Sequence, residues 1–346
     1  MSLPGTSSQI GLLHGAGYVG GELVRLVSDH PGCTLAAVTS RTFAGQPLHT
    51  PHAHLRGRVE GMFIAPDELN LADLDALVIA AEHGRTMHLV PELREAGFDG
   101  PIVDLSSDFR FATAEAYEAA NGKPHAAPAW IAEAHYRIPE VTGPLPADAR
   151  FVANPGCFAT AMTLGLAPLA AQGVPLTASI TALTGASGSG ASPSSATHFP
   201  ARDGNVRAYK VLQHRHAPEV VQTLGDHVRV DFVPVSGPWT RGIWGTVQVE
   251  WPEPVDEATV SGWFADAYGD APLVRCSPGT LPELKPVAHT PFGDVGWQVH
   301  GRTLVVGVAI DNLLKGAASQ AVQNLNHLLG LPDALGLLST ANAPAT

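Results

Sequence analysis

The chain has 346 residues, which is enough for two domains with a sizeable buried core. Its 20 Lys and Arg against 32 Asp and Glu give a formal net charge of −12, which argues against a general binder of nucleic acids or anionic membranes. The three cysteines are far apart, so we expect no disulfide or zinc–cysteine framework and a reducing compartment. Met1–Gln9 contain no basic and apolar leader, and no stretch is long enough to span a membrane, so we expect a cytoplasmic protein.

A short apolar run over residues 10–14 predicts the first β-strand, and a glycine-rich turn follows it. The turn has the GxGxxG spacing, and an apolar stripe predicts a helix that begins near Tyr18. Between a strand and a helix, this spacing lets the backbone approach a pyrophosphate at the helix N-terminus. Such turns also occur where nothing binds, but the context predicts a dinucleotide site at Gly15, Gly17, Tyr18, Val19 and Gly20.

The second predicted strand, residues 35–39, ends in Ser40-Arg41. A site for NAD usually has an acidic residue here, which holds the ribose hydroxyls. A hydroxyl and a guanidinium are instead suited to a 2′-phosphate. We therefore expect NADP(H), with the alternative that Arg41 is a solvated loop charge.

Two further buried strands, residues 76–81 and 101–106, alternate with helical segments. This alternation predicts a parallel, doubly wound sheet of the Rossmann type, an α/β fold. In such sheets the loops that follow the carboxyl ends of the strands line the ligand crevice. We expect that edge to gather Ser40, His83, Ser106, Arg110 and Cys157.

The segment Asn154-Pro155-Gly156-Cys157 places a lone cysteine at a turn between a short strand and a helix. The helix is predicted from an apolar stripe formed by Phe158, Met162, Leu166 and Leu169. Unpaired N–H groups and the helix dipole favour a thiolate, which attacks carbonyl carbon. The alternative is a buried structural cysteine, and this segment alone does not separate the two.

A Gly/Ser-rich run over residues 185–195 is either a linker or a nest of donors for an anion. The cations Arg202, Arg207 and Lys210 follow it and favour the anion. His214 and His216 come next, and Glu219 follows them, so a general base oriented by a carboxylate is plausible. We expect no metal site, because no matching ligand set accompanies these histidines or the loop residues His49, His52 and His54.

The last third of the chain predicts an α+β domain with a mainly antiparallel sheet. A hairpin turn is predicted at Gly301-Arg302, and an apolar helical stripe runs from Leu314 to Leu328. A broad apolar sheet face left uncovered would be a natural dimer surface. The strands are predicted over residues 228–235, 246–251, 273–276, 295–300 and 304–310.

From Ile10 to about Leu329 the chain resembles the N-acetyl-gamma-glutamyl-phosphate reductases, within the aspartate-semialdehyde dehydrogenase superfamily. Each matching motif is short, but their order makes the resemblance specific. The motifs begin at Gly17, Ser40, Asp104, Asn154, Ser192, Tyr209, His214, Thr240 and Ile310.

The resemblance implies reduction of N-acetyl-gamma-glutamyl phosphate by NADPH in arginine biosynthesis. Cys157 would form a thioester as phosphate leaves, and hydride would convert it through a thiohemiacetal to an aldehyde. His214, oriented by Glu219, would relay protons, with His216 as the rival.

The resemblance also implies Asn312 as a cofactor contact and a homo-oligomer, a dimer or a tetramer. Residues 1–154 and 312–346 would form the NADP-binding domain, and residues 155–311 the catalytic and dimerisation domain. The substrate contacts implied are Arg110, Asn154, Ser187 and His198.

Two residues depart from the family pattern. His14 stands where the family has a glycine, and Glu82 places a carboxylate near the cofactor crevice.

Two alternative functions remain open. The first is the same chemistry on an aminoadipyl or glutamyl phosphate bound to an acidic carrier protein, which the net charge of −12 does not favour. The second is a regulator that binds NADP without catalysis.

Overall fold

The computed structural model describes residues 7–338, so the two ends of the predicted first domain, residues 1–6 and 339–346, lie outside the described residues. The described chain forms two compact units. The first comprises residues 7–139, 144–155 and 317–338. The second comprises residues 140–143 and 156–316.

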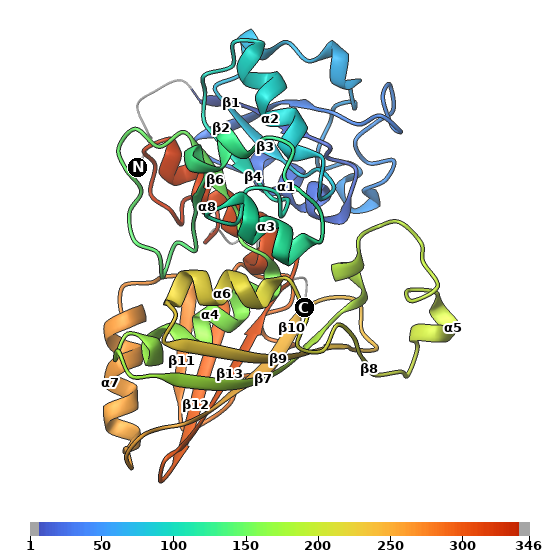
Figure 1. Cartoon of the computed structure of the whole chain (residues 1–346). Helices are drawn as coiled ribbons and strands as arrows, with labels where there is room; N and C mark the ends of the chain where they lie inside the picture. Colours follow the sequence, from blue (N-terminus) through green and yellow to red (C-terminus); the bar gives the residue numbers. More distant parts are fainter. Residues whose placement is uncertain (1–6, 339–346) are drawn as a thin grey trace. The chain divides into compact units, whose positions relative to one another are not determined.

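The first unit is built on a six-stranded sheet in which every pairing is parallel (Figure 1). Its order is β2-β1-β3-β4-β6-β5, which confirms the predicted parallel sheet. The strands are β1 Ser8–Leu13, β2 Cys33–Val38, β3 Ala76–Ile79, β4 Ile102–Asp104, β5 His135–Tyr136 and β6 Phe151–Ala153. The helices are α1 Tyr18–Ser28, α2 Thr86–Glu95, α3 Ala114–Asn121 and α8 Ser319–Leu328.

Every residue of β3 is buried, because helices cover both faces of the sheet. Leu77 and Ile79 pack in one apolar cluster with Met87 and Val90 of α2. Helix α8 contacts β3, β4 and α1. The doubly wound arrangement therefore follows from strands that are apolar on both sides.

Helix α8 differs from the predicted apolar stripe in two ways. The segment Leu314–Ala318 before it is a π-helix, and α8 itself begins only at Ser319. Its polar side chains are also buried, because the chain supplies partners for them. Asn324 donates to the Asn154 side chain at 2.9 Å and to the backbone oxygen of Arg137 at 3.2 Å.

The second unit contains a seven-stranded mixed sheet, in the order β11-β12-β13-β10-β7-β9-β8. Four of its pairings are antiparallel, and β7–β9 and β11–β12 are parallel, which confirms a mainly antiparallel sheet. The predicted hairpin is also confirmed, since His300 pairs with Thr303 across Gly301-Arg302. The strands are β7 Leu176–Thr184, β8 Arg207–Ala208, β9 Val228–Ser236, β10 Ile243–Glu250, β11 Val274–Pro278, β12 Gly293–His300 and β13 Thr303–Ile310.

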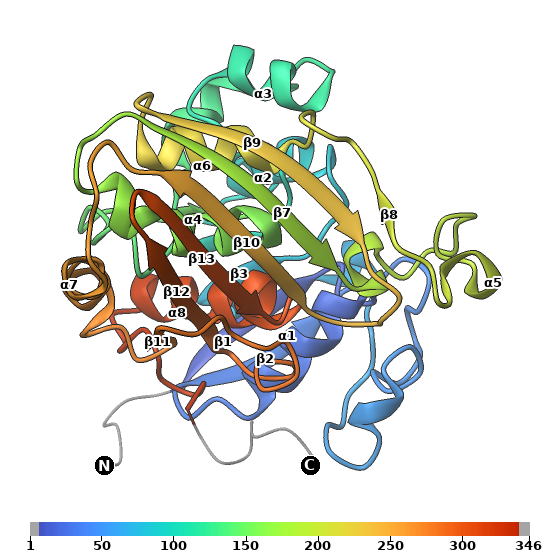
Figure 2. The ribbon, with the colours of Figure 1, turned by 90° about the horizontal axis from the view of Figure 1, so that it is seen from below.

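Helices α4, α6 and α7 share one apolar cluster with the strands, and Figure 2 shows the sheet in front of α4 and α6. The predicted helix is confirmed and its apolar stripe is buried, but burial extends beyond the stripe to all of α4 except Cys157 and Ala167. The helix lies so close to the sheet that a Cβ on Gly165 would come within 2.8 Å of Val308. The helices are α4 Cys157–Ala170, α5 Phe199–Arg202, α6 His216–Leu224 and α7 Glu257–Tyr268.

We expected an uncovered sheet face to be apolar, as a dimer surface would be. The exposed residues of the central strands β7 and β10 are instead largely polar. Thr177, Ser179 and Thr181 of β7 and Gln248 of β10 are exposed, alternating with buried residues. Within residues 7–338, no helix combines the length and apolarity that crossing a bilayer requires.

A buried ion pair lies at the edge of the second unit. Nζ of Lys315 is 2.5 Å from Oε1 of Glu140, and the side chains are 0% and 4% exposed. Desolvation makes each charge costly unless the other is present.

We expect Lys315→Met to lower the free energy of unfolding by about 3–5 kcal/mol, because it leaves the Glu140 charge buried without Lys315. The double variant Lys315→Met/Glu140→Leu removes both charges and should recover most of that loss. Urea denaturation of the three proteins measures this. Equal loss in the single and double variants would contradict the argument.

Candidate functional site

The cysteine of the Pro-Gly turn begins helix α4. Cys157 is the first residue of α4, and Gly156 is its N-cap. The Cys157 side chain is half-buried, whereas burial raises the pKa of the Cys33 thiol to about 11. Cys157 therefore combines access with the unpaired N–H groups of a helix start, as the sequence predicted.

Glu219 and His216 pack against this turn. The N–H of Gly156 donates to Oε2 of Glu219 at 3.0 Å, and Nε2 of His216 lies 3.9 Å from Oε1 of Glu219. A Cβ on Gly156 would lie 2.4 Å from Nε2 of His216, so only glycine fits there. A Cβ on Gly316 would likewise lie 2.7 Å from Cβ of Cys157. The cysteine turn, an imidazole and a buried carboxylate thus form one cluster.

His214 has a different environment from His216. Its Nδ1 accepts the backbone N–H of His216 at 3.2 Å, at the start of α6. Its ring packs edge-on against Phe158 and Phe232, with centroid separations of 5.5 and 5.6 Å. Burial, together with the positive charges of Arg215 and Lys210, lowers the pKa of His214 to about 4. His214 is therefore neutral near pH 7, with one ring nitrogen already bonded.

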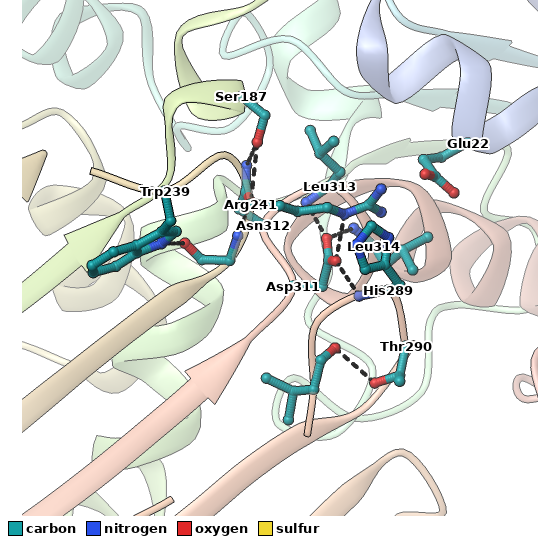
Figure 3. Close-up of polar contacts among 12 residues, drawn as sticks. Glu22, Ser187, Trp239, Arg241, His289, Thr290, Asp311, Asn312, Leu313 and Leu314 are labelled. Carbon is teal, nitrogen blue, oxygen red and sulfur yellow. Dashed lines mark hydrogen bonds and ion pairs between the residues drawn. The ribbon is translucent and has the colours of Figure 1, made fainter. Parts of the chain in front are cut away.

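The Gly/Ser loop is held by Asn312 (Figure 3). Nδ2 of Asn312 donates to Oγ of Ser187 at 3.0 Å, and its Oδ1 accepts the N–H of Gly242 at 2.6 Å. The adjacent Asp311 is fully buried and accepts from Nε of Arg241 at 2.5 Å. Ser187 and Asn312, expected as ligand contacts, therefore brace the loop. His198 is exposed beyond it.

The glycine turn of the first unit has the features of a phosphate cradle. Helix α1 begins at Tyr18, as predicted, with Gly17 as its N-cap. A Cβ on Gly20 would lie 2.2 Å from the backbone oxygen of Gly15, so the turn closes only around glycine. A Cβ on Gly17 would meet nothing within 4 Å, so that side of the turn is open to a ligand.

A cavity of about 270 Å³ lies beside this turn, and its polar lining includes Arg41, Arg85 and His14 as well as Asp67 and Glu92. Nε of Arg85 donates to Nε2 of His14 at 3.4 Å. Burial lowers the pKa of His14, and the positive charges of Arg85 and Arg41 lower it further. His14 has φ of 60°, a left-handed conformation that suits the glycine of the family better. Two arginines and a histidine of lowered pKa thus line one cavity, while Glu82 is exposed.

Sequence reasoning missed Arg85, because it lies at the N-cap of α2, where no motif marks it. Three predicted contacts instead have internal partners. Ser106 is fully buried and donates to Oδ2 of Asp104 at 2.7 Å. Nε of Arg110 donates to the backbone oxygen of Asn154 at 2.8 Å. This bond links the segments that follow strands β4 and β6.

Family models for semialdehyde dehydrogenases match both parts of the chain. Residues 9–146 match the NAD binding domain and residues 157–312 the dimerisation domain. A protein from Methanothrix thermoacetophila named N-acetyl-gamma-glutamyl-phosphate reductase is 38% identical, over 97% of this chain and 99% of its own. One of the same name from Rubrobacter xylanophilus is 40% identical over 95% of this chain and 98% of its own. This chain belongs to the N-acetyl-gamma-glutamyl-phosphate reductase family.

Solved structures support the same fold at much lower identity. Aspartate semialdehyde dehydrogenase II from Vibrio cholerae has a TM-score of 0.71 and 17% identity, over 94% of this chain and 99% of that one. The enzyme from Candida albicans, solved with NADP, has a TM-score of 0.69 and 15% identity, with the same coverage of 94% and 99%. This member of the N-acetyl-gamma-glutamyl-phosphate reductase family thus has the two-part α/β fold of these structures.

We expect Gly156→Ala to lower oxidoreductase activity about 100-fold or more, because the new methyl group displaces His216 from the cysteine turn. Steady-state kinetics measure this. Gly262→Ala in α7 is the matched control, since its Cβ would meet nothing within 4 Å. Full activity in Gly156→Ala would show that this packing is not needed.

Proposed function

We propose that this chain reduces N-acetyl-gamma-glutamyl phosphate to N-acetylglutamate semialdehyde and phosphate with NADPH, in arginine biosynthesis. The observation that carries the proposal is the accessible Cys157 at the start of α4, with His216 and Glu219 packed against the preceding glycine. The names of relatives at 38–40% identity support the acetylated substrate.

The reaction begins at the sulfur of Cys157, which the N-terminus of α4 stabilises as a thiolate. The thiolate attacks the acyl carbon, the carbon–oxygen bond to phosphate breaks, and phosphate leaves with the electron pair. A thioester remains on Cys157. NADPH, when bound, supplies the hydride that reduces this carbonyl. Collapse of the thiohemiacetal then releases the aldehyde and restores the thiolate.

We assign the proton transfer to His216 rather than to His214. A general base works best with a pKa near the working pH, and the pKa of His214 is lowered to about 4. His216 instead packs on the cysteine turn, with Glu219 at 3.9 Å. The carboxylate stabilises the imidazolium that forms when His216 takes the thiol proton.

The first unit supplies residues that fit NADP(H). The turn from Gly15 to Gly20 would hold the pyrophosphate, and Arg41, Arg85 and His14 would hold the 2′-phosphate. The two guanidinium groups are suited to the charge of the phosphate, and His14 can supply a further hydrogen bond. Ser40, which precedes Arg41 in the chain, is buried.

We also propose that the chain forms a homo-oligomer, either a dimer or a tetramer. Its support is the match of residues 157–312 to a dimerisation domain. A carrier-bound substrate receives no support from the relatives, which are named for the acetylated one. A cytoplasmic location stays a prediction from sequence.

Cys157→Ala should abolish NADP+ reduction with N-acetylglutamate semialdehyde and phosphate, while NADP+ affinity stays unchanged. Cys157→Ser should be nearly as inactive, because a hydroxyl ionises far less readily than a thiol. Kinetics and fluorescence titration measure the two properties. Undiminished turnover would rule out the covalent route and favour a regulator without catalysis.

Arg41→Ala should weaken NADPH binding about 10- to 100-fold and leave NADH binding nearly unchanged, because it removes a charged hydrogen bond to the 2′-phosphate. Titration with each cofactor measures this. Arg56→Ala, an exposed arginine of the following loop, is the control. An equal loss for both cofactors would refute the role.

A further inference from the structure

A second cavity, about 180 Å³ in volume, lies within the second unit and is not used by the mechanism above. Its polar lining consists of Ser195, Arg202, Asn205, Arg207 and Ser236, and no Asp or Glu lines it. Two guanidinium groups without a lining carboxylate make this cavity suited to an anion.

Arg202 is the unusual member of this lining, because it is only 9% exposed. Its Nη2 donates to the backbone oxygen of Thr184 at 3.1 Å. Its buried Nε has no hydrogen-bond partner within residues 7–338. Buried polar groups are normally bonded and buried charges are normally paired, so a guanidinium in this state indicates a missing anionic partner.

Arg202 of this cavity and Cys157 both influence the pKa of the Tyr209 hydroxyl. Burial raises the pKa of Tyr209, the charge of Cys157 raises it further, and the charge of Arg202 lowers it. The Tyr209 ring also packs against His214, with centroids 5.8 Å apart. Tyr209 and Cys157 pack against the same apolar cluster, and Tyr209 follows Arg207 of the cavity lining by two residues.

We propose that this cavity binds the α-carboxylate and acetamido end of the substrate, with Arg202 as the cation that selects the carboxylate. The proposal rests on the function proposed above, in which Cys157 attacks the other end of the same molecule. The guanidinium of Arg202 donates to the carboxylate, and Asn205 and Ser236 offer an amide and a hydroxyl to the acetamido group. A buried donor left unpaired rejects analogues that lack its partner.

Binding of two unreactive ligands tests the proposal without turnover. The first ligand, N-acetylglutamine, keeps the α-carboxylate of the substrate and has a neutral side chain. The second ligand, N-acetylglutamine α-amide, has a neutral amide in place of that carboxylate. By calorimetry, the wild-type protein should bind the acid about 10- to 100-fold more tightly than the amide, since a hydrogen bond to a charged group is lost.

Arg202→Gln should abolish this preference, and Arg202→Lys should retain part of it, because lysine keeps the charge but not the planar donors. Arg229→Gln is the matched control, since Arg229 lies exposed on β9 of the same sheet and should bind like wild type. An unchanged NADP+ affinity in Arg202→Gln shows that the fold is intact. An unchanged preference for the acid in Arg202→Gln overturns the proposal.

Kinetics separate the carboxylate from the phosphate of the reaction. In the direction of aldehyde oxidation, Arg202→Gln should raise KM for N-acetylglutamate semialdehyde about 10- to 100-fold and leave KM for inorganic phosphate unchanged. A raised KM for phosphate, or displacement of N-acetylglutamine from wild type by inorganic phosphate, would make the cavity a phosphate site and overturn the proposal. If wild type binds the acid selectively but does not turn over the semialdehyde, the proposed function fails while the carboxylate site stands.

Discussion

The site depends on one close packing contact, the approach of His216 and Glu219 to the Gly156 turn. Because Gly156 has no side chain, the imidazole can occupy the space that a Cβ would fill. The backbone N–H of the same residue binds the buried Glu219 carboxylate. One glycine thereby positions the helix start that carries Cys157, the imidazole and the carboxylate, and a change in any of them disturbs the other two.

Buried polar groups give the site a fixed frame. Asp311 accepts hydrogen bonds from Arg241 and from the backbone of His289, and Asn312 holds the Gly/Ser loop through Ser187. In the first unit, Asn324 of α8 binds Asn154. A satisfied buried network favours a single arrangement of the chain, because any other arrangement leaves polar atoms without partners. Several residues expected to touch ligands have this bracing role.

Cations in cavities mark the places where this chain would meet anions. In the first unit, Arg41 and Arg85 line one cavity together with His14, whose ring accepts a hydrogen bond from Arg85. In the second unit, Arg202 is desolvated with an unbonded donor. A protein of net charge −12 thus keeps arginines in the two cavities where we propose that anions bind.

The amino-acid pattern was sufficient to predict the parallel sheet, the helix that begins at Tyr18, the hairpin at Gly301 and the cysteine at a helix start. These follow from local patterns of apolar residues and glycines, which depend on neighbours in the chain. Only the tertiary structure decided that α4 is buried on all sides, that His216 rather than His214 meets Glu219 at 3.9 Å, and that Arg85 joins Arg41. Those facts depend on contacts between residues distant in sequence, and two histidines separated by one residue have no local feature that tells which one packs against a glycine 60 residues away.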